Sequence, residues 1–487
     1  MFKTLSCTAL SRGFFFMPLA AGLALSGCGG DGSTPTPTPT SSNSPPAITG
    51  GNIDVSVAEN TAAAVFTVNA SDPDGDTLSY SLGGEDAAAF AIDASGAVRF
   101  LAPPNFDLPR DADRNNIYRF TMGVSDGKMS ASVSARIAVE NNREGIAVTR
   151  IMTGLVDPVG LSPTYASGRE MAVALKNGSY IRFSGARAPG EAVPAPVDVL
   201  SANPDFVRLL DIAWGEASAY WSGPMLLYES TYAFEVLRPG QGQRREGNLT
   251  FGTNSAVEGK LFIGADGEAF ASLGDPSGEF AQAPQTPVQD RFGRIFRLEP
   301  SCGASLLNLC ANQIAGGVRQ PGGFAQVNGL TAFADRGGSL QHEISLFALD
   351  VFTQTDNPLN FGWPFLEGIS VLRSGAPSPL VTPSLVYPFG TGEREGAGIV
   401  MGVQYGGSIA GIAGHFVFAD SSGAIFSIPA NQLSRDSVRD MASIELRTLD
   451  FAPDAGAIDR VVEIAADAAG VLYILDADGE IFRVDPA

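Results

Sequence analysis

The sequence predicts an all-β protein in which a β-sandwich is followed by a six-bladed β-propeller. Between residues 48 and 145, six or seven short strands alternate apolar and polar residues and are separated by turn clusters, a spacing typical of a sandwich. Residues 146–487 repeat a strand, an Asp-Gly-type turn and a second strand without a long helical pattern, which is typical of a propeller. Six blades would take about 57 residues each, although seven blades of about 49 would also fit this length.

The first 47 residues predict a secretion signal and a tether. A positively charged start precedes the apolar run 14–25, which is too short to cross a bilayer as a permanent helix. The run ends in Leu25-Ser26-Gly27-Cys28, which resembles the bacterial lipoprotein box, although an ordinary secretion signal would also fit. We expect residues 1–27 to be removed and Cys28 to carry lipid. Residues 28–47, rich in Gly, Ser, Thr and Pro, would then form a solvated tether.

The charge of the chain narrows its partners and its location. It carries 52 acidic and 31 basic residues, a formal net charge of −21, so no basic face for nucleic acid is expected. Such a chain suits the space outside the cytoplasm, where it can meet cations. Gly29, rather than Asp, follows Cys28. This favours the outer membrane or surface of a bacterium, with the membrane as a partner through the lipid.

Two of the four cysteines remain for the folded part. Cys7 lies in the signal and Cys28 takes lipid, which leaves Cys302 and Cys310. In an oxidising compartment, so close a pair with no other Cys nearby predicts a local disulfide rather than a metal site. Closing so short a loop should add at most about 2–3 kcal/mol.

Acidic and amide side chains of the first module gather at the ends of its expected strands. Carboxylate and amide oxygens in loops are the ligands that calcium prefers, so these residues are candidate metal ligands. Acidic turns that only keep a spacer domain soluble are the alternative. The candidates are Glu59, Asp72, Asp74, Asp107, Glu140 and Asn141.

The segments "AEN", "NASDPDGD", "FAIDASGAVRF", "PNFD" and "VENN" give the first module a resemblance to the cadherin repeat. In that family calcium binds at the junction between consecutive repeats. The resemblance therefore implies half of a calcium site facing the next domain. Its ligands would be Glu59, Asp107, Glu140 and Asn141. Asp72 and Asp74 would face the tether, where no preceding repeat completes a ligand set.

Five segments of the second module carry another resemblance. They are "DRFGRIFRLEP", "GGVRQPGGFA", "DRGGSLQHEI", "NFGWP" and "GVQYGGSIAGIAGHFVFAD". In this order they resemble the glucose/sorbosone dehydrogenase family, the soluble quinoprotein sugar dehydrogenases, over essentially the whole module. The resemblance implies a six-bladed propeller that uses pyrroloquinoline quinone (PQQ) and calcium. Of the residues that hold the quinone, Arg319 and Arg460 would be kept.

The catalytic residue of that family has no counterpart here. In the family, a His takes the proton from the sugar C1 hydroxyl as hydride passes to PQQ. Its position falls on Ala256, which cannot accept a proton. The only histidines of the chain, His342 and His415, fall elsewhere and are expected to be ordinary loop or strand residues. A Gln of the family falls on Phe206, and no Lys follows Lys260 where the family has one. Since a general base contributes about 10²- to 10⁴-fold to a rate, we predict no catalytic residue.

These observations support two functions. The first is a lipid-anchored binding protein of the bacterial envelope whose propeller mouth takes a carbohydrate or a protein. The alternative is a PQQ- and calcium-dependent aldose dehydrogenase that oxidises the sugar C1 hydroxyl with a different base. Calcium-dependent self-association through the first module is a third hypothesis, for which a single repeat gives little reach.

Overall fold

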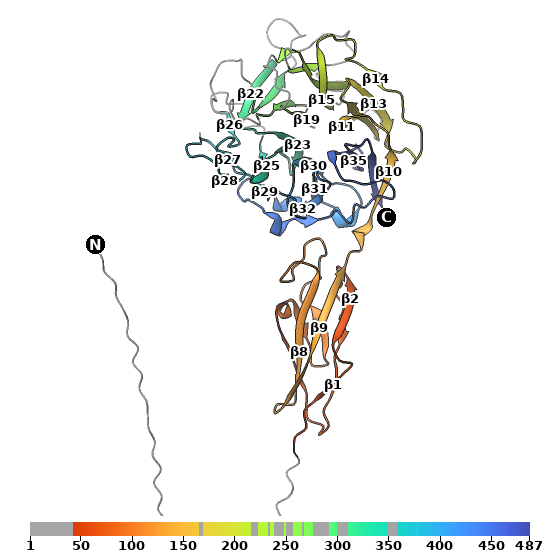
Figure 1. The fold of residues 1–487 in the computed structure, drawn as a ribbon, viewed down its shortest axis with the longest axis vertical. Helices are drawn as coiled ribbons and strands as arrows, with labels where there is room; N and C mark the ends of the chain where they lie inside the picture. The colour runs from red at the N-terminus through yellow and green to blue at the C-terminus, as the bar shows by residue number, and fades with distance from the viewer. Residues whose placement is uncertain are drawn as a thin grey trace, which may run out of the picture.

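The computed structural model describes residues 42–164, 169–215, 223–231, 234–237, 248–249, 257–264, 267–275, 292–299, 310–348, 358–376 and 378–487. Within these ranges no helix has the length and apolarity needed to cross a membrane. A narrow β-sandwich stands at the rim of a ring-shaped propeller (Figure 1). The expected fold class, all-β with a sandwich followed by a six-bladed propeller, is confirmed. The helices described are single turns: η1 (Ala87–Ala89), η2 (Arg143–Gly145), η4 (Ala410–Ile412), η5 (Ala430–Gln432) and η6 (Met441–Ser443).

The sandwich has two main sheets. One has the order β2 (Ile53–Ala58), β9 (Ser130–Glu140), β8 (Ile117–Ser125) and β5 (Ser79–Gly83). The other has the order β3 (Phe66–Thr67), β7 (Ala97–Phe100) and β6 (Phe90–Ile92), and a ribbon pairs β1 (Ala47–Thr49) with β4 (Asn69–Ser71). β2 runs parallel to β9, with Ile53 opposite Ala135. Alternate residues of β8, among them Phe120 and Met122, point into the core, as the period of two in a strand requires.

The described strands of residues 146–487 form six sheets of four or five strands, which are the blades of the propeller, and one separate two-stranded sheet. Blade 1 contains β11 (Pro158–Pro163), β12 (Glu170–Leu175), β13 (Ser179–Ser184) and β14 (Val197–Asp198). Blade 2 contains β15 (Phe206–Gly215), β16 (Gly223–Ser230), β17 (Phe234–Leu237) and β18 (Asn248–Leu249). Blade 3 contains β19 (Gly259–Ile263), β20 (Ala269–Leu273), β21 (Arg294–Glu299), β22 (Cys310–Gly316) and β26 (Leu359–Asn360).

The other three blades complete the ring. Blade 4 contains β23 (Pro321–Val327), β24 (Leu330–Asp335), β25 (Gln341–Phe347) and β29 (Leu385–Pro388). Blade 5 contains β30 (Ile399–Gln404), β31 (His415–Asp420), β32 (Ile425–Pro429) and β33 (Glu445–Leu446). Blade 6 contains β34 (Val461–Ala466), β35 (Leu472–Asp476), β36 (Ile481–Pro486) and β10 (Ile146–Met152). A separate hairpin pairs β27 (Leu366–Glu367) with β28 (Ser370–Val371).

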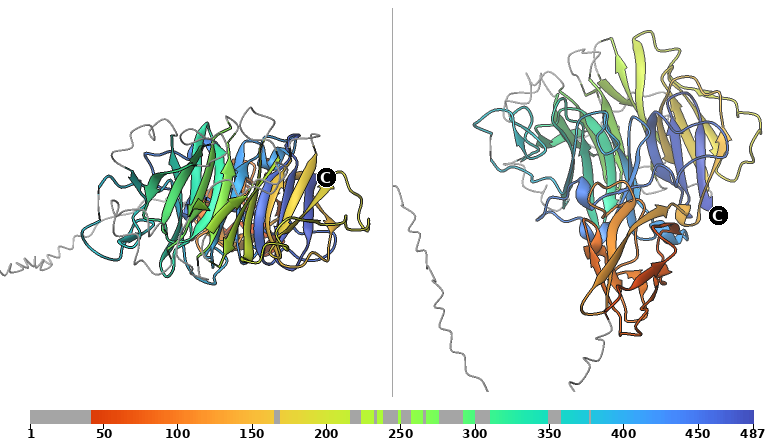
Figure 2. Two further views of the ribbon diagram at one scale, coloured as in Figure 1. Left: turned by 90° about the horizontal axis from the view of Figure 1, so that it is seen from above. Right: turned by 60° about the horizontal axis from the view of Figure 1, so that its bottom comes forward.

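The ring closes because blade 6 combines both ends of the module. β10, the first strand after the sandwich, pairs antiparallel with β36, with Val148 opposite Val484. The inner strand of each blade contacts that of the next, and β34 contacts β11. Fully buried apolar side chains such as Phe416 and Phe426 fill the blades' faces. Figure 2 shows the propeller as a thick disc, with the sandwich against the blue C-terminal blades.

The Asp-Gly turns of the sequence repeat do join strands, but they do not occupy equivalent places in the blades. Gly267, Gly423 and Gly479 have φ angles of 79°, 95° and 92°, a left-handed conformation that favours Gly. Gly267 joins the two inner strands of blade 3, whereas the other two join the second and third strands of blades 5 and 6. The repeat therefore indicated the architecture without giving the limits of each blade.

Candidate functional site

The sandwich and the propeller meet at a buried ion cluster around Arg447. Arg447 follows β33 of blade 5 and is 1% exposed. Its Nη1 lies 2.6 Å from Asp107 of the sandwich and 2.5 Å from Glu144 of η2. The same guanidinium lies 2.8 Å from Glu445 and 3.0 Å from Asp450 of the propeller. One cation thus joins four carboxylates from both parts of the chain.

Four of the predicted calcium ligands lie near this joint. Besides Asp107, Glu59 is 2% exposed and accepts hydrogen bonds from two backbone N–H groups, so it fixes loops that face the propeller. Asn141 accepts a hydrogen bond from the Arg143 N–H group. Glu140 offers its backbone carbonyl to the Glu59 N–H group, while its side chain is exposed. The guanidinium of Arg447, rather than a metal ion, is what the structure places against Asp107.

The other two predicted ligands lie at the tether end of the sandwich. Asp72 accepts hydrogen bonds from the backbone N–H groups of Asp74 and Asp76. Asp74 accepts one from the N–H group of Ser44, which precedes β1. The structure therefore separates Asp72 and Asp74 from the ligands at the joint. Calcium binding by either group stays a prediction.

Crowding shifts the pKa values of the joint in opposite directions. Burial raises the pKa of Asp107 to about 9, although the charge of Arg447 opposes the rise. Burial also opposes ionisation of Glu445, yet a hydrogen bond from His415 and the charge of Arg447 lower its pKa to about 2. Burial thus favours the protonated form of Asp107, whereas the partners of Glu445 favour its charged form.

Replacing Asp107 by Asn should flatten the pH dependence of stability. The folded pKa of Asp107, about 9, lies above its unfolded value of about 4. Ionisation therefore opposes folding, and the wild-type free energy of unfolding should fall as pH rises from about 4 to 9. Urea unfolding across this range should show the smaller slope in Asp107→Asn. The exposed Asp54→Asn serves as control, and parallel profiles for wild type and Asp107→Asn would refute the assignment.

The six inner strands all begin on one face of the propeller, here called the mouth. The predicted quinone-binding residues, Arg319 and Arg460, both lie there, just before β23 of blade 4 and β34 of blade 6. Arg319 lies over the ring of Trp363, with Cζ 5.4 Å from the ring centroid, and donates to the Arg336 carbonyl at 3.0 Å. The Arg460 side chain is 58% exposed and lies 3.6 Å from Asp459.

Two cations at the mouth are paired within the protein, which leaves less positive charge for PQQ, a tricarboxylate that needs cations around it. Arg336 lies 2.8 Å from Glu258, and Lys260 lies 2.5 Å from Glu463. Each of these cations is therefore already neutralised by a carboxylate that would repel the quinone. Arg319 contacts an aromatic ring and a backbone carbonyl, but its buried Nε has no hydrogen-bond partner among the described residues.

A buried ion triad closes the channel along the propeller axis. Lys260 of blade 3 reaches across the ring to Glu463 of blade 6 and also lies 3.8 Å from Asp211 of blade 2. Lys260 and Asp211 are 7% and 2% exposed. Burial raises the pKa of Asp211 to about 7, with Lys260 opposing the rise. Beyond the triad, the inner strands line a cavity of about 320 Å³ with both apolar and polar walls, among them Trp214, Phe262 and Gln404.

Neither histidine can act as a base at the mouth. His342 is 0% exposed, and its Nδ1 accepts a hydrogen bond from the Gly337 N–H group at 3.0 Å. Its Nε2 therefore carries the proton and donates to the Gly396 carbonyl at 3.0 Å. Burial lowers the pKa of His342 further. His415 lies on β31 at the joint, 3.3 Å from Glu445. The chain has two histidines in all, so no imidazole remains for the mouth.

The remaining predicted positions either belong to the apolar core or lie outside the described residues. Phe206 begins β15 and packs against a buried apolar cluster, so this position is structural. Ala256, Cys28 and Cys302 lie outside the described residues, as does the side chain of Cys310. The base position, the lipid attachment and the disulfide therefore stay predictions.

Sequence reasoning missed Arg447 and the channel triad. Arg447 stands in "IELRTLDF", two residues after Glu445 and three before Asp450, which is a local sign of a buried ion pair. Its partner Asp107 is 340 residues away, and nothing local links the two. Lys260 and Glu463 are likewise joined only by the closing of the ring.

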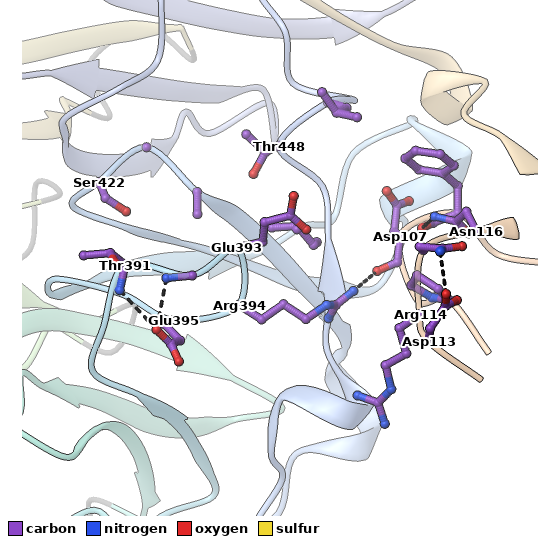
Figure 3. A pocket seen from close by; sticks show the side chains of 18 of the residues that line it. Asp107, Asp113, Arg114, Asn116, Thr391, Glu393, Arg394, Glu395, Ser422 and Thr448 are labelled. Carbon is purple, nitrogen blue, oxygen red and sulfur yellow. Dashed lines mark hydrogen bonds between the residues drawn. The ribbon is translucent and has the colours of Figure 1, made fainter. Parts of the chain in front are cut away.

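A cleft of about 810 Å³ opens between the sandwich and blades 4 and 5. Arg394 of the propeller and Arg114 of the sandwich both extend into it (Figure 3). Arg394 donates to the backbone carbonyl of Asp107 at 2.5 Å and to those of Met441 and Ile444. It therefore ties the sandwich to the propeller from inside the cleft.

Comparison with known proteins identifies the first module. Residues 43–140 match the family model of the bacterial Ig domain. No curated protein matches the chain.

Solved structures with a similar course of chain include a sugar dehydrogenase, an enzyme of a carbohydrate-active family and a protocadherin. Soluble aldose sugar dehydrogenase from Escherichia coli, in its apo-form, is 16% identical over 70% of this chain and 100% of its own, with a TM-score of 0.43. A Trichoderma reesei enzyme of Carbohydrate-Active Enzymes family AA12 is 14% identical over 70% of this chain and 96% of its own, with a TM-score of 0.47. Human protocadherin-24 EC1-2 is 20% identical over 29% of this chain and 59% of its own, with a TM-score of 0.19.

Proposed function

We propose that the chain is a binding protein of the bacterial envelope, in which the propeller takes a carbohydrate at its mouth without oxidising it. Lipid on Cys28 would hold it to the membrane, and residues 28–47 would form the tether. The observation that carries the proposal is the placement of the histidines. One is enclosed by two backbone hydrogen bonds and the other lies at the joint, so neither can take a proton from a sugar.

The joint supports the part of the proposal that concerns the sandwich. Besides the Arg447 cluster, Arg143 donates to the carbonyls of Asp450 and Ala452, and the Leu446 N–H group donates to the Asp107 carbonyl. Because these contacts are numerous and several of them are buried, they favour a fixed angle between the sandwich and the propeller. The sandwich would then act as a stiff spacer that holds the propeller away from the membrane.

The mouth offers one feature suited to a sugar. Trp363 is partly buried, and its Nε1 donates to the Asp275 carbonyl at 2.7 Å, which fixes the ring. A fixed indole ring presents an apolar surface next to polar groups, as sugar recognition requires. Arg319, which lies over this ring, can donate hydrogen bonds to hydroxyl groups. A protein ligand remains the second reading of the same surface.

Calorimetry on the mature chain tests the proposal. A panel of aldoses should bind, and Trp363→Ala should weaken that binding, whereas the exposed Arg435→Ala should not. Titration with PQQ and calcium at micromolar concentration should give no saturable heat. Saturable PQQ binding that is lost in Arg319→Ala would refute the proposal and favour the dehydrogenase.

A further inference from the structure

We propose that the cleft between the sandwich and the propeller is a binding site for an acidic saccharide, one that carries a carboxylate on a hydroxylated ring. The cleft lies at the rim of the disc, between the two parts of the chain, and its lining includes none of Arg319, Lys260, Trp363 and Arg460. It therefore does not depend on the function proposed for the mouth.

Two guanidinium groups in the cleft lack a carboxylate partner. Within the part of the chain that the structure describes, neither Arg394 nor Arg114 has a carboxylate oxygen within 4.0 Å. Arg394 donates to three backbone carbonyls, which hold it in place but do not neutralise it. Burial lowers the pKa of Arg394 and the charge of Arg114 lowers it further, while the more weakly acting charges of Asp107, Glu393 and Glu445 raise it. A ligand carboxylate near both groups would remove this repulsion and gain charge-assisted hydrogen bonds.

Most carboxylates that line the cleft are engaged within the protein. Asp107 pairs with Arg447, and Asp113 accepts a hydrogen bond from Asn115 and lies 3.5 Å from Arg119. Glu395 accepts hydrogen bonds from the N–H groups of residues 391 and 392. Because these carboxylates already have partners, they compete only weakly with a ligand carboxylate for the two arginines.

The rest of the lining suits a hydroxylated ligand. Glu393, Asn115 and Thr391 are exposed on the cleft and offer both donors and acceptors, as sugar hydroxyl groups do. Leu449, 59% exposed, and the partly buried Phe106 supply apolar surface for the C–H face of a ring. A volume of about 810 Å³ is in the usual range for small-molecule sites, which favour boundaries between domains.

The position of the lining residues favours a saccharide over an acidic peptide. They come from the loop between β7 and β8 and from the β29–β30, β31–β32 and β33–β34 connections. The cleft therefore offers side chains rather than the open edge of a strand. An extended peptide gains much of its affinity by adding to such an edge, which is not available here.

Calorimetry on the mature chain tests the site with trigalacturonate as the acidic probe, maltotriose as the neutral probe and triglutamate as the acidic peptide. Trigalacturonate should bind, and the other two should bind at least tenfold more weakly. Arg114→Asn removes one guanidinium and suits the local backbone, since φ is 56° at this position and Asn tolerates it. This variant should weaken trigalacturonate binding about tenfold or more, and Arg394→Lys should weaken it less than Arg394→Gln.

Two controls keep the result interpretable. Arg373→Gln removes an exposed arginine outside the cleft and should leave the affinity unchanged. Thermal unfolding should show that Arg114→Asn folds like wild type. Equal binding of trigalacturonate and maltotriose, tighter binding of triglutamate, or full affinity in Arg114→Asn would each overturn the proposal. Because the mouth is itself proposed to take a carbohydrate, the three titrations are repeated in Trp363→Ala, and only binding that persists there is assigned to the cleft.

Discussion

Replacing Arg447 by Met is expected to lower the free energy of unfolding by about 3–5 kcal/mol and to release the sandwich from the propeller. Removing one partner from a buried ion cluster leaves its other charges without compensation, which sets this scale. Here the four carboxyl groups of the cluster, of which Glu445 favours the charged form, would lose the cation that lies within 3.0 Å of each of them. Urea unfolding gives the energy, and small-angle scattering should detect a wider range of angles between the two parts.

Calcium provides a sharper test of the same cluster. Without Arg447, the four carboxylates would form an oxygen-rich, uncompensated site of the type that calcium prefers. Millimolar calcium should therefore raise the melting temperature of Arg447→Met more than that of the wild type, each measured against chelator. The exposed Arg435→Met should change stability by less than about 0.5 kcal/mol. An Arg447→Met variant as stable as Arg435→Met would show that the cluster does not hold the joint.

Replacing Lys260 by Met should destabilise the propeller by a similar amount, about 3–5 kcal/mol. Asp211 is 2% exposed and would lose the cation that opposes the rise of its pKa. The wild-type pKa of Asp211 is about 7 in the folded state, against about 4 when unfolded. Its ionisation therefore opposes folding as pH rises through 7, and the opposition grows without Lys260. The loss should thus be larger at pH 8 than at pH 5.

A combined variant separates the charge effect from a packing effect. Lys260→Met with Asp211→Asn and Glu463→Gln removes all the charges of the triad together. It should recover most of the stability, because a neutral set of similar volume has no unpaired ion. A loss in Lys260→Met that is the same at both pH values, and that the combined variant does not recover, would contradict the role given to the triad.

The architecture could be predicted from the sequence because its signals are local. Alternating apolar residues in β8 and hairpin turns at Gly423 and Gly479 depend on neighbours in the chain, so each strand could be identified from its own residues. The limits of the blades could not, since the Asp-Gly turn joins different strand pairs in different blades.

The candidate site was harder to predict because its contacts link distant segments. The sequence placed Glu59 and Asp107 at the end of the sandwich that faces the next domain, and the structure brings both to the joint. It did not indicate that an arginine 340 residues away enters between the carboxylates. The cleft could not be predicted for the same reason. Arg114 and Arg394 approach each other only because the sandwich docks on the propeller.

We propose that this propeller does not oxidise sugars, and dye reduction tests this proposal most directly. The mature chain is incubated with PQQ and calcium, and an artificial electron acceptor is followed in the presence of a panel of aldoses. We predict no aldose-dependent reduction above a blank without protein, since neither histidine is free to take the proton of the C1 hydroxyl. Aldose-dependent reduction that disappears in Arg319→Ala would contradict the claim.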